Sequence, residues 1–135
     1  MKKLLFLFCL LSWSVLHAQK TINRPPFIAK ATETIEIAAI NLSDTATVVD
    51  VDAKFIPKNW IRIAPATCLV ADNGERYQVW QGVGIELGQE IWMPESGEAT
   101  FSLIFPPLPA SVKSFDFVEG EGERDFNLFG ISLIG

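Results

Sequence analysis

Histidine and cysteine, the residue types that most often carry nucleophilic or metal chemistry, are scarce in this chain. The 135 residues include one histidine, His17, and two cysteines, Cys9 and Cys68. A Ser–His–Asp or Cys–His arrangement needs an imidazole to take the proton of the nucleophile, and zinc sites draw mainly on Cys and His. His17 and Cys9 lie in an N-terminal segment that we expect to be removed. We therefore expect no enzyme activity, no catalytic residue, no metal site and no cofactor.

The N-terminal segment has the parts of a secretory signal peptide. Two lysines follow the first methionine, an apolar run occupies residues 4–11, and the small residue Ala18 precedes a usable cleavage site. The run is much shorter than the ~20 residues of a membrane-spanning helix. We expect residues 1–18 to be cleaved near Ala18 and residues 19–135 to be secreted or periplasmic, without a transmembrane segment. A buried N-terminal helix and a lipid anchor on Cys9 are the alternatives.

The mature chain is acidic and has a single cysteine. Removal of the signal leaves nine basic against sixteen acidic side chains, a net charge of −7. An acidic surface repels phosphate backbones and anionic lipid headgroups, so we expect no nucleic-acid partner. Cys68 alone cannot form an internal disulfide, so the hydrophobic core has to hold the domain. We expect Cys68 to be a small buried hydrophobe, with a reactive thiol as the alternative.

Carboxylates could supply chemistry without histidine. Glu119, Glu121, Glu123 and Asp125 occupy every second position of a glycine-rich loop. They lack the ligand spacing of a calcium-binding helix–loop–helix, so a solvated acidic hairpin tip is the expected role and calcium binding the alternative. A hydrolase that uses two carboxylates also stays open, because their ~5–9 Å separation is a property of three-dimensional structure.

Three tryptophans of the mature chain, Trp60, Trp80 and Trp92, are weak candidates for ligand binding. Exposed indole rings could stack on sugar rings, as they do in β-sandwich carbohydrate-binding modules. Ile61 and Ile63 have the opposite phase of strand alternation to Trp60, which places Trp60 on a wet face. Large aromatic residues at strand ends nevertheless belong to a core or its rim more often than to a ligand platform.

The elements that must position these residues all have strand character. Turn residues recur about every ten residues beyond residue 20, and the segments between them are rich in β-branched and aromatic residues, which is typical of a sandwich or barrel. The prediction is eight or nine strands, drawn from the segments 27–31, 34–40, 45–55, 60–63, 67–71, 76–83, 90–93, 100–105, 114–118 and 126–133.

The alternation within these segments indicates the fold class. Within the segment 45–55, every second side chain from residue 49 onward is apolar, which is typical of a sheet that is wet on one side; these residues are Val49, Val51, Ala53 and Phe55. Asn73-Gly74 is the strongest hairpin signal in the chain. Two packed antiparallel sheets in one domain satisfy this pattern. We therefore predict an all-β, Ig-like antiparallel β-sandwich over residues 19–135, with a closed barrel as the alternative.

Several segments of the second half resemble a known family. They are Trp60–Ile63, Leu69–Tyr77, Gly84–Leu87, Trp92–Glu98, Phe101–Pro109 and Lys113–Gly120. Together they resemble an Ig-like β-sandwich domain of secreted proteins in gut Gram-negative anaerobes of the Bacteroidetes type. In that family the domain often precedes a thioredoxin-like disulfide reductase domain. The resemblance covers about residues 30–133 and implies fold and compartment. This chain has no Cys-x-x-Cys, so the reductase activity is not carried over.

These observations lead to one functional expectation and two alternatives. We expect an exported, non-catalytic interaction module that binds a protein of the cell envelope, or is accessory to one; an edge strand could recruit such a partner by strand addition. A carbohydrate-binding module that uses exposed tryptophans is the first alternative, with a glycan as ligand. A carboxylate-dependent hydrolase is the second. The exposure of the three tryptophans distinguishes the first alternative from a purely structural role for these residues.

Overall fold

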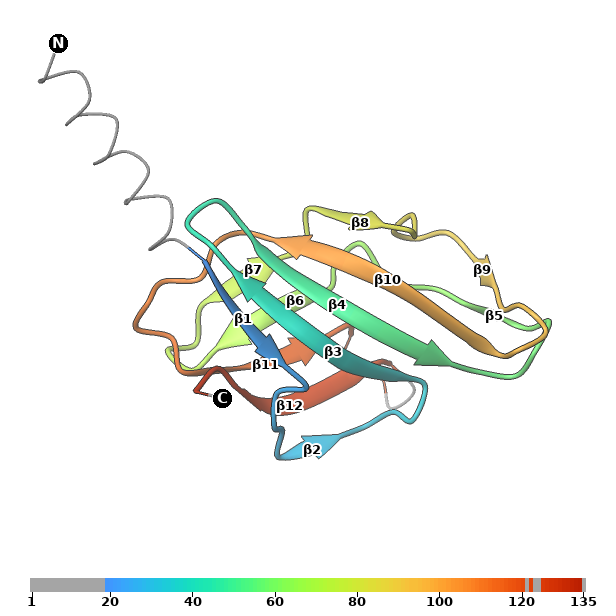
Figure 1. Cartoon of the computed structure of the whole chain (residues 1–135), viewed down its shortest axis with the longest axis horizontal. Coiled ribbons are helices and arrows are strands. Elements are labelled where there is room, and N and C mark those ends of the chain that lie inside the picture. The colour runs from blue at the N-terminus through green and yellow to red at the C-terminus, as the bar shows by residue number, and fades with distance from the viewer. Residues whose placement is uncertain (1–18, 121, 123–124, 135) are drawn as a thin grey trace, which may run out of the picture.

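A computed structural model describes residues 19–120, 122 and 125–134. The predicted signal peptide, residues 1–18, lies outside the described residues. Every helix or strand found among the described residues is a β-strand, and there are twelve. Two antiparallel sheets of five strands each lie face to face, and the remaining two strands form a separate ribbon (Figure 1). The predicted fold class, an antiparallel β-sandwich, is confirmed, with more and shorter strands than expected.

The first sheet contains the longest strands. In spatial order it consists of β1 (Lys20–Asn23), β3 (Ile35–Leu42), β4 (Thr47–Lys54), β10 (Glu98–Phe105) and β8 (Gln81–Val83). Its inner face follows the predicted alternation, since Val49, Val51 and Ala53 are at most 1% exposed. The sequence did not predict β1, because Ile22 is the one large apolar side chain in its four residues.

The second sheet supplies the other half of the sandwich. In spatial order it consists of β2 (Ala29–Lys30), β12 (Asn127–Ser132), β11 (Ser114–Val118), β6 (Cys68–Ala71) and β7 (Arg76–Gln78). The predicted Asn-Gly hairpin joins β6 to β7. Gly74 has a φ of +87° and its N–H donates to the Ala71 carbonyl, while the Ala71 N–H donates to the Glu75 carbonyl. The hairpin therefore closes with a glycine bulge.

The predicted strand 76–83 is two strands that belong to different sheets. The Val79 N–H donates to the Thr67 carbonyl beside the second sheet, whereas the Trp80 N–H donates to the Ile104 carbonyl in the first. The chain therefore crosses from one sheet to the other between these two residues. A period-two pattern has the same form on both sides of such a crossing, so the pattern could not reveal it.

The ribbon consists of β5 (Trp60–Ile61) and β9 (Ile91–Trp92), and it lies beside one end of the first sheet (Figure 1). The chain reaches it directly from β4, which ends at Lys54. The Phe55 N–H donates to the Gly97 carbonyl in the loop before β10, and Phe55 is 36% exposed. The prediction that Phe55 shares the buried face of β4 is therefore wrong, because the strand ends one residue before it.

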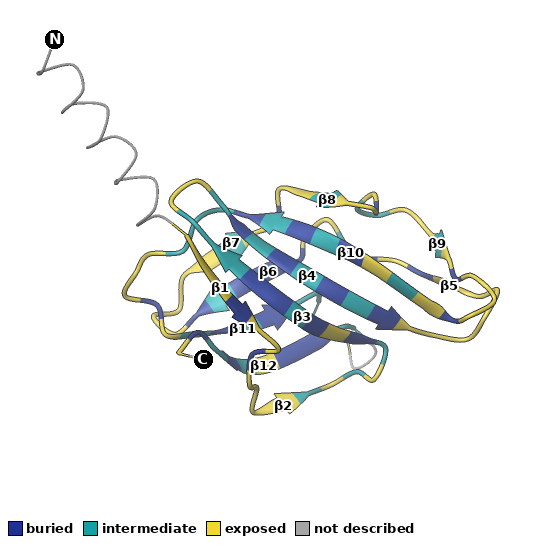
Figure 2. Cartoon of the chain, viewed as in Figure 1, coloured by how far each residue is buried: buried dark blue, intermediate teal, exposed yellow. Residues whose placement is uncertain are grey.

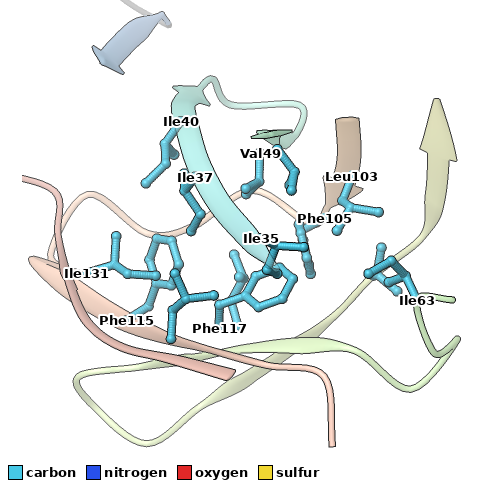
Figure 3. Packing of buried hydrophobic residues seen from close by; sticks show 14 of the residues in the cluster. Ile35, Ile37, Ile40, Val49, Ile63, Leu103, Phe105, Phe115, Phe117 and Ile131 are labelled. Atoms are coloured by element: carbon cyan, nitrogen blue, oxygen red, sulfur yellow. The ribbon is translucent and has the colours of Figure 1, made fainter. Parts of the chain in front are cut away.

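The core is formed by inward side chains from both sheets. Phe115 and Phe117 of β11 face Ile35 of β3 and Phe105 of β10 (Figure 3). The rings of Phe105 and Phe117 meet edge to face, with centroids 6.3 Å apart and planes at 77°. Both residues are completely buried. Burial of these side chains supplies the main stabilisation of the fold.

Gly82 of β8 is required by a close approach within the chain. A Cβ atom at this position would lie 2.5 Å from the Ile85 carbonyl oxygen and 2.7 Å from its Cγ2. Ile85 is buried and lies directly against Gly82. We expect Gly82→Ala to lower the free energy of unfolding by about 1–3 kcal/mol, as measured by urea denaturation. Gln81→Ala, one residue earlier on the exposed side, should be nearly neutral; equal effects of the two variants would contradict this account.

Candidate functional site: the tryptophan ribbon

The ribbon holds two of the three candidate tryptophans side by side. Trp60 and Trp92 are direct cross-strand partners, and their exposed fractions are 41% and 62%. Directly opposed residues project from the same face of a ladder. The Met93 N–H donates to the Asn59 carbonyl at 2.7 Å and the Lys58 N–H to the Met93 carbonyl at 3.2 Å. These bonds fix the register, so both indole rings are presented on one defined surface.

The opposite face of the ribbon is anchored in the core, which explains why the tryptophans face solvent. Ile61 and Ile91 form the next cross-strand pair. Ile61 is 3% exposed, Ile91 packs partly against the core, and Ile63 is completely buried. Because successive side chains alternate between faces, burial of the isoleucines turns the tryptophans outward. The prediction that Trp60 lies on a wet face is confirmed.

Trp80 is also exposed, at 55%, but it lies elsewhere. The backbone N–H of Trp80 donates to the carbonyl of Ile104, next to the last residue of β10. The ribbon lies near Gly97, which comes just before the first residue of β10 and accepts a hydrogen bond from the backbone N–H of Phe55. At ~3.3 Å per residue these two points of the strand are roughly 20 Å apart. All three tryptophans therefore lie outside the core, and Trp80 does not join Trp60 and Trp92 in a platform of three.

Other large apolar residues are exposed at the ribbon end of the sandwich. Phe55 and Ile56 lie in the connection between β4 and β5, and Ile56 is 58% exposed. We call Phe55, Ile56, Trp60 and Trp92 the ribbon patch. Exposed positions cover this end of the molecule in Figure 2. Clustered exposed apolar residues on a soluble domain mark an interaction surface more often than isolated ones do. The sequence did not single out Phe55 or Ile56.

The charges beside the ribbon patch include two cations that form no ion pair with another described residue. Elsewhere in the described part of the chain, carboxylates pair with Arg24, Lys30 and Lys54. The hydrogen bond from Lys30 to a carboxylate, at Glu36, is the main cause of its raised pKa, and desolvation opposes the shift. Lys58 and Arg62, on either side of Trp60, make no ion pair within residues 19–120. Lys58 and Arg62 therefore place two cationic side chains close in sequence to the indole ring of Trp60 in the patch.

The turn that leads into the ribbon contains a strained residue. The Asn59 N–H donates to the Ile56 carbonyl at 3.1 Å, with Pro57 and Lys58 between them. Lys58 has a φ of +65°, a conformation that favours glycine. We expect Lys58→Gly to raise the free energy of unfolding by about 0.5–1 kcal/mol. Lys58→Ala removes the same charge but keeps the strain, so a gain of equal size in that control would contradict the explanation.

The remaining sequence candidates have structural roles. Cys68 is a buried free thiol at 7% exposure, as predicted, and Arg76 Nη1 donates to its sulfur at 3.5 Å. This basic neighbour comes from the adjoining strand, and the local sequence did not reveal it. The Glu119 carboxylate accepts the N–H groups of Ala64 and Phe126 at 3.1 Å each. Both carboxylate oxygens of Glu119 therefore accept backbone hydrogen bonds, so Glu119 has a structural role at the hairpin between β11 and β12.

The calcium and hydrolase alternatives find no support in the described residues. Glu121 and Glu123 lie outside them, and residues 19–120, 122 and 125–134 contain no group of three side chains arranged to hold a metal ion. Two concavities on this part of the chain are each lined by one carboxylate, Asp44 in one and Glu36 in the other. Neither offers the carboxylate pair that such a hydrolase needs.

No helix in this part of the chain is long and apolar enough to cross a membrane.

Comparisons with known proteins identify no relative. No family model, no curated protein and no solved structure matches the chain. The resemblance to a secreted Ig-like domain therefore remains a prediction from the sequence, and the functional argument rests on the residues of the ribbon.

Proposed function

We propose that this chain is an exported, non-catalytic binding module, and that the ribbon patch binds a protein of the cell envelope. One observation carries the proposal: Trp60 and Trp92 are exposed on a ribbon whose other face is fixed in the core. Tryptophan and arginine are enriched among the residues that dominate binding energy at protein interfaces. A preformed surface also avoids part of the entropic cost of ordering side chains on binding. The signal peptide predicted from the sequence supports the proposed compartment.

The composition of the patch favours a protein over other ligands. Ile56 is a branched aliphatic residue at 58% exposure, and Phe55 lies beside it in the chain. Such side chains suit the apolar centre of a protein interface, whereas a sugar gains most from flat aromatic surfaces. Lys58 and Arg62 could pair with carboxylates at the rim of such an interface.

The proposal is tested by capture of the partner from an envelope extract, followed by binding measurements with the purified partner. The wild-type protein and a Trp60→Ala/Trp92→Ala variant serve as baits, with Trp80→Ala as the matched control. We expect one envelope protein to be retained by the wild type and by the control and lost with the double variant. Equal retention by all three baits would count against the ribbon as the binding surface.

A glycan ligand is the second candidate, and the exposure of the tryptophans favours it specifically. Two indole rings on one face of a rigid ribbon could stack on successive sugar rings. Affinity electrophoresis in gels that contain soluble polysaccharides tests this candidate. Retardation that disappears in the Trp60→Ala/Trp92→Ala variant would support it. Identical mobility with and without every polysaccharide would remove it.

A further inference from the structure

A groove of about 670 Å³ lies at the end of the sandwich opposite to the ribbon. It forms where the start of β1, the turn between β3 and β4, the segment before β11 and the residues after β12 come together (Figure 1). Its apolar lining includes Leu42, Leu108, Val112 and Leu133. Val112 and Leu133 are buried and also belong to the core. The volume falls within the ~300–1,000 Å³ typical of small-molecule sites.

Two lysines line this apolar groove. Lys20 Nζ donates to the Leu133 carbonyl at 3.2 Å, which holds the ammonium group over the groove and leaves it further protons to donate. Lys113 is exposed, and its backbone N–H is fixed by the Asp72 carboxylate at 2.9 Å. Within residues 19–120 neither lysine forms an ion pair. Asp44 is the one carboxylate in the lining.

This combination is unusual for a domain with an excess of acidic residues. Arg24, Lys30 and Lys54 are each matched by a carboxylate on the protein. Lys20 and Lys113 line an apolar surface instead, and neither forms an ion pair with another described residue. A ligand that complements both features needs an apolar chain and a negatively charged head. An ammonium group binds a carboxylate by charge-assisted hydrogen bonds, which are stronger than neutral ones.

We propose that the groove binds a single-chain carboxylate amphiphile of the fatty-acid class. The alkyl chain lies along the apolar surface between Leu42, Leu108 and Leu133, and the carboxylate lies between Lys20 and Lys113. Burial of the methylene groups removes apolar surface from water, so the chain supplies the affinity and the lysines supply the orientation. The site is separate from the ribbon patch, so this proposal does not depend on the identity of the envelope partner.

The test is a titration of purified residues 19–135 with dodecanoate, kept below the micelle concentration of dodecanoate. Binding is monitored by isothermal titration calorimetry and by amide NMR. We expect saturable one-to-one binding, with the largest shifts at Ala110 and Lys113 and none at the indole N–H of Trp60. Dodecyltrimethylammonium has the same chain length with the opposite charge, and we expect it to bind at least about tenfold more weakly.

A charge reversal separates recognition of the head from burial of the chain. Lys113→Glu should weaken dodecanoate binding by about tenfold or more. Lys54→Glu makes the same change of charge at the other end of the first sheet and should leave the affinity unchanged. The proposal is overturned if dodecanoate shows no saturable binding, if the cationic amphiphile binds equally well, or if the NMR shifts map to the ribbon patch. Thermal unfolding of each variant confirms that the fold is retained.

Discussion

Replacement of Trp60 and Trp92 together by alanine is expected to weaken binding of the envelope partner by at least about 100-fold. Truncation of a central interface tryptophan often costs about 2 kcal/mol or more, and the two rings lie on the same face of one ribbon. The free energy of unfolding should change little, because both side chains are largely exposed and Ile61 and Ile91 still anchor the ribbon. Calorimetry or surface plasmon resonance with the purified partner measures the effect.

Trp80→Ala is the matched control for this prediction. It removes a side chain of the same type and similar exposure, but Trp80 lies near the other end of β10. Its affinity should stay within about threefold of the wild type. If Trp80→Ala weakened binding as much as the double variant, the binding surface would have to extend along β8 instead of being confined to the ribbon.

Phe117→Ala is expected to lower the free energy of unfolding by about 3–5 kcal/mol. Phe117 is completely buried at the centre of β11 and meets Phe105 of the opposing sheet edge to face. Its removal leaves a cavity between the two sheets and also loses the aromatic contact. Since a typical domain is stable by only ~5–15 kcal/mol, and no disulfide links the described residues, this loss is a substantial share of the total stability.

Phe117→Leu keeps most of the apolar volume and serves as the control. We expect it to cost less than half as much as Phe117→Ala, because a smaller cavity remains. Both variants are compared by urea denaturation monitored by circular dichroism. A loss below about 1 kcal/mol for Phe117→Ala would show that the sheets can close over the cavity, and that the core is less tightly packed than Figure 3 indicates.

The sequence predicted the fold where local alternation determines the structure. In β4 the inward positions Val49, Val51 and Ala53 are buried as predicted, and Phe115 and Phe117 of β11 are buried on alternate positions in the same way. In these strands each apolar residue is next to polar ones, so burial of one face fixes the orientation of the whole strand. The alternation failed where a strand ended early, as it did at Phe55.

The candidate site was predictable in its residue types and not in its geometry. Alternation placed Trp60 on a wet face, but no local signal pairs Trp60 with Trp92, thirty-two positions later in the chain. That pairing depends on the hydrogen bonds of Asn59 and Met93 and on burial of Ile61. Trp80 could not be separated from the other two, because the crossing between the sheets leaves no mark on the local pattern. Long-range register therefore decides which aromatics meet.

The most direct test of the proposed binding surface is fluorine NMR of residues 19–135, the predicted mature chain, labelled with 5-fluorotryptophan. This part of the sequence contains three tryptophans, so three resonances are expected, each assigned with a Trp→Phe variant. On addition of the envelope partner we expect the resonances of Trp60 and Trp92 to shift together, with that of Trp80 unchanged. A saturated complex in which Trp60 and Trp92 keep their free positions would contradict the assignment of the ribbon patch as the binding surface.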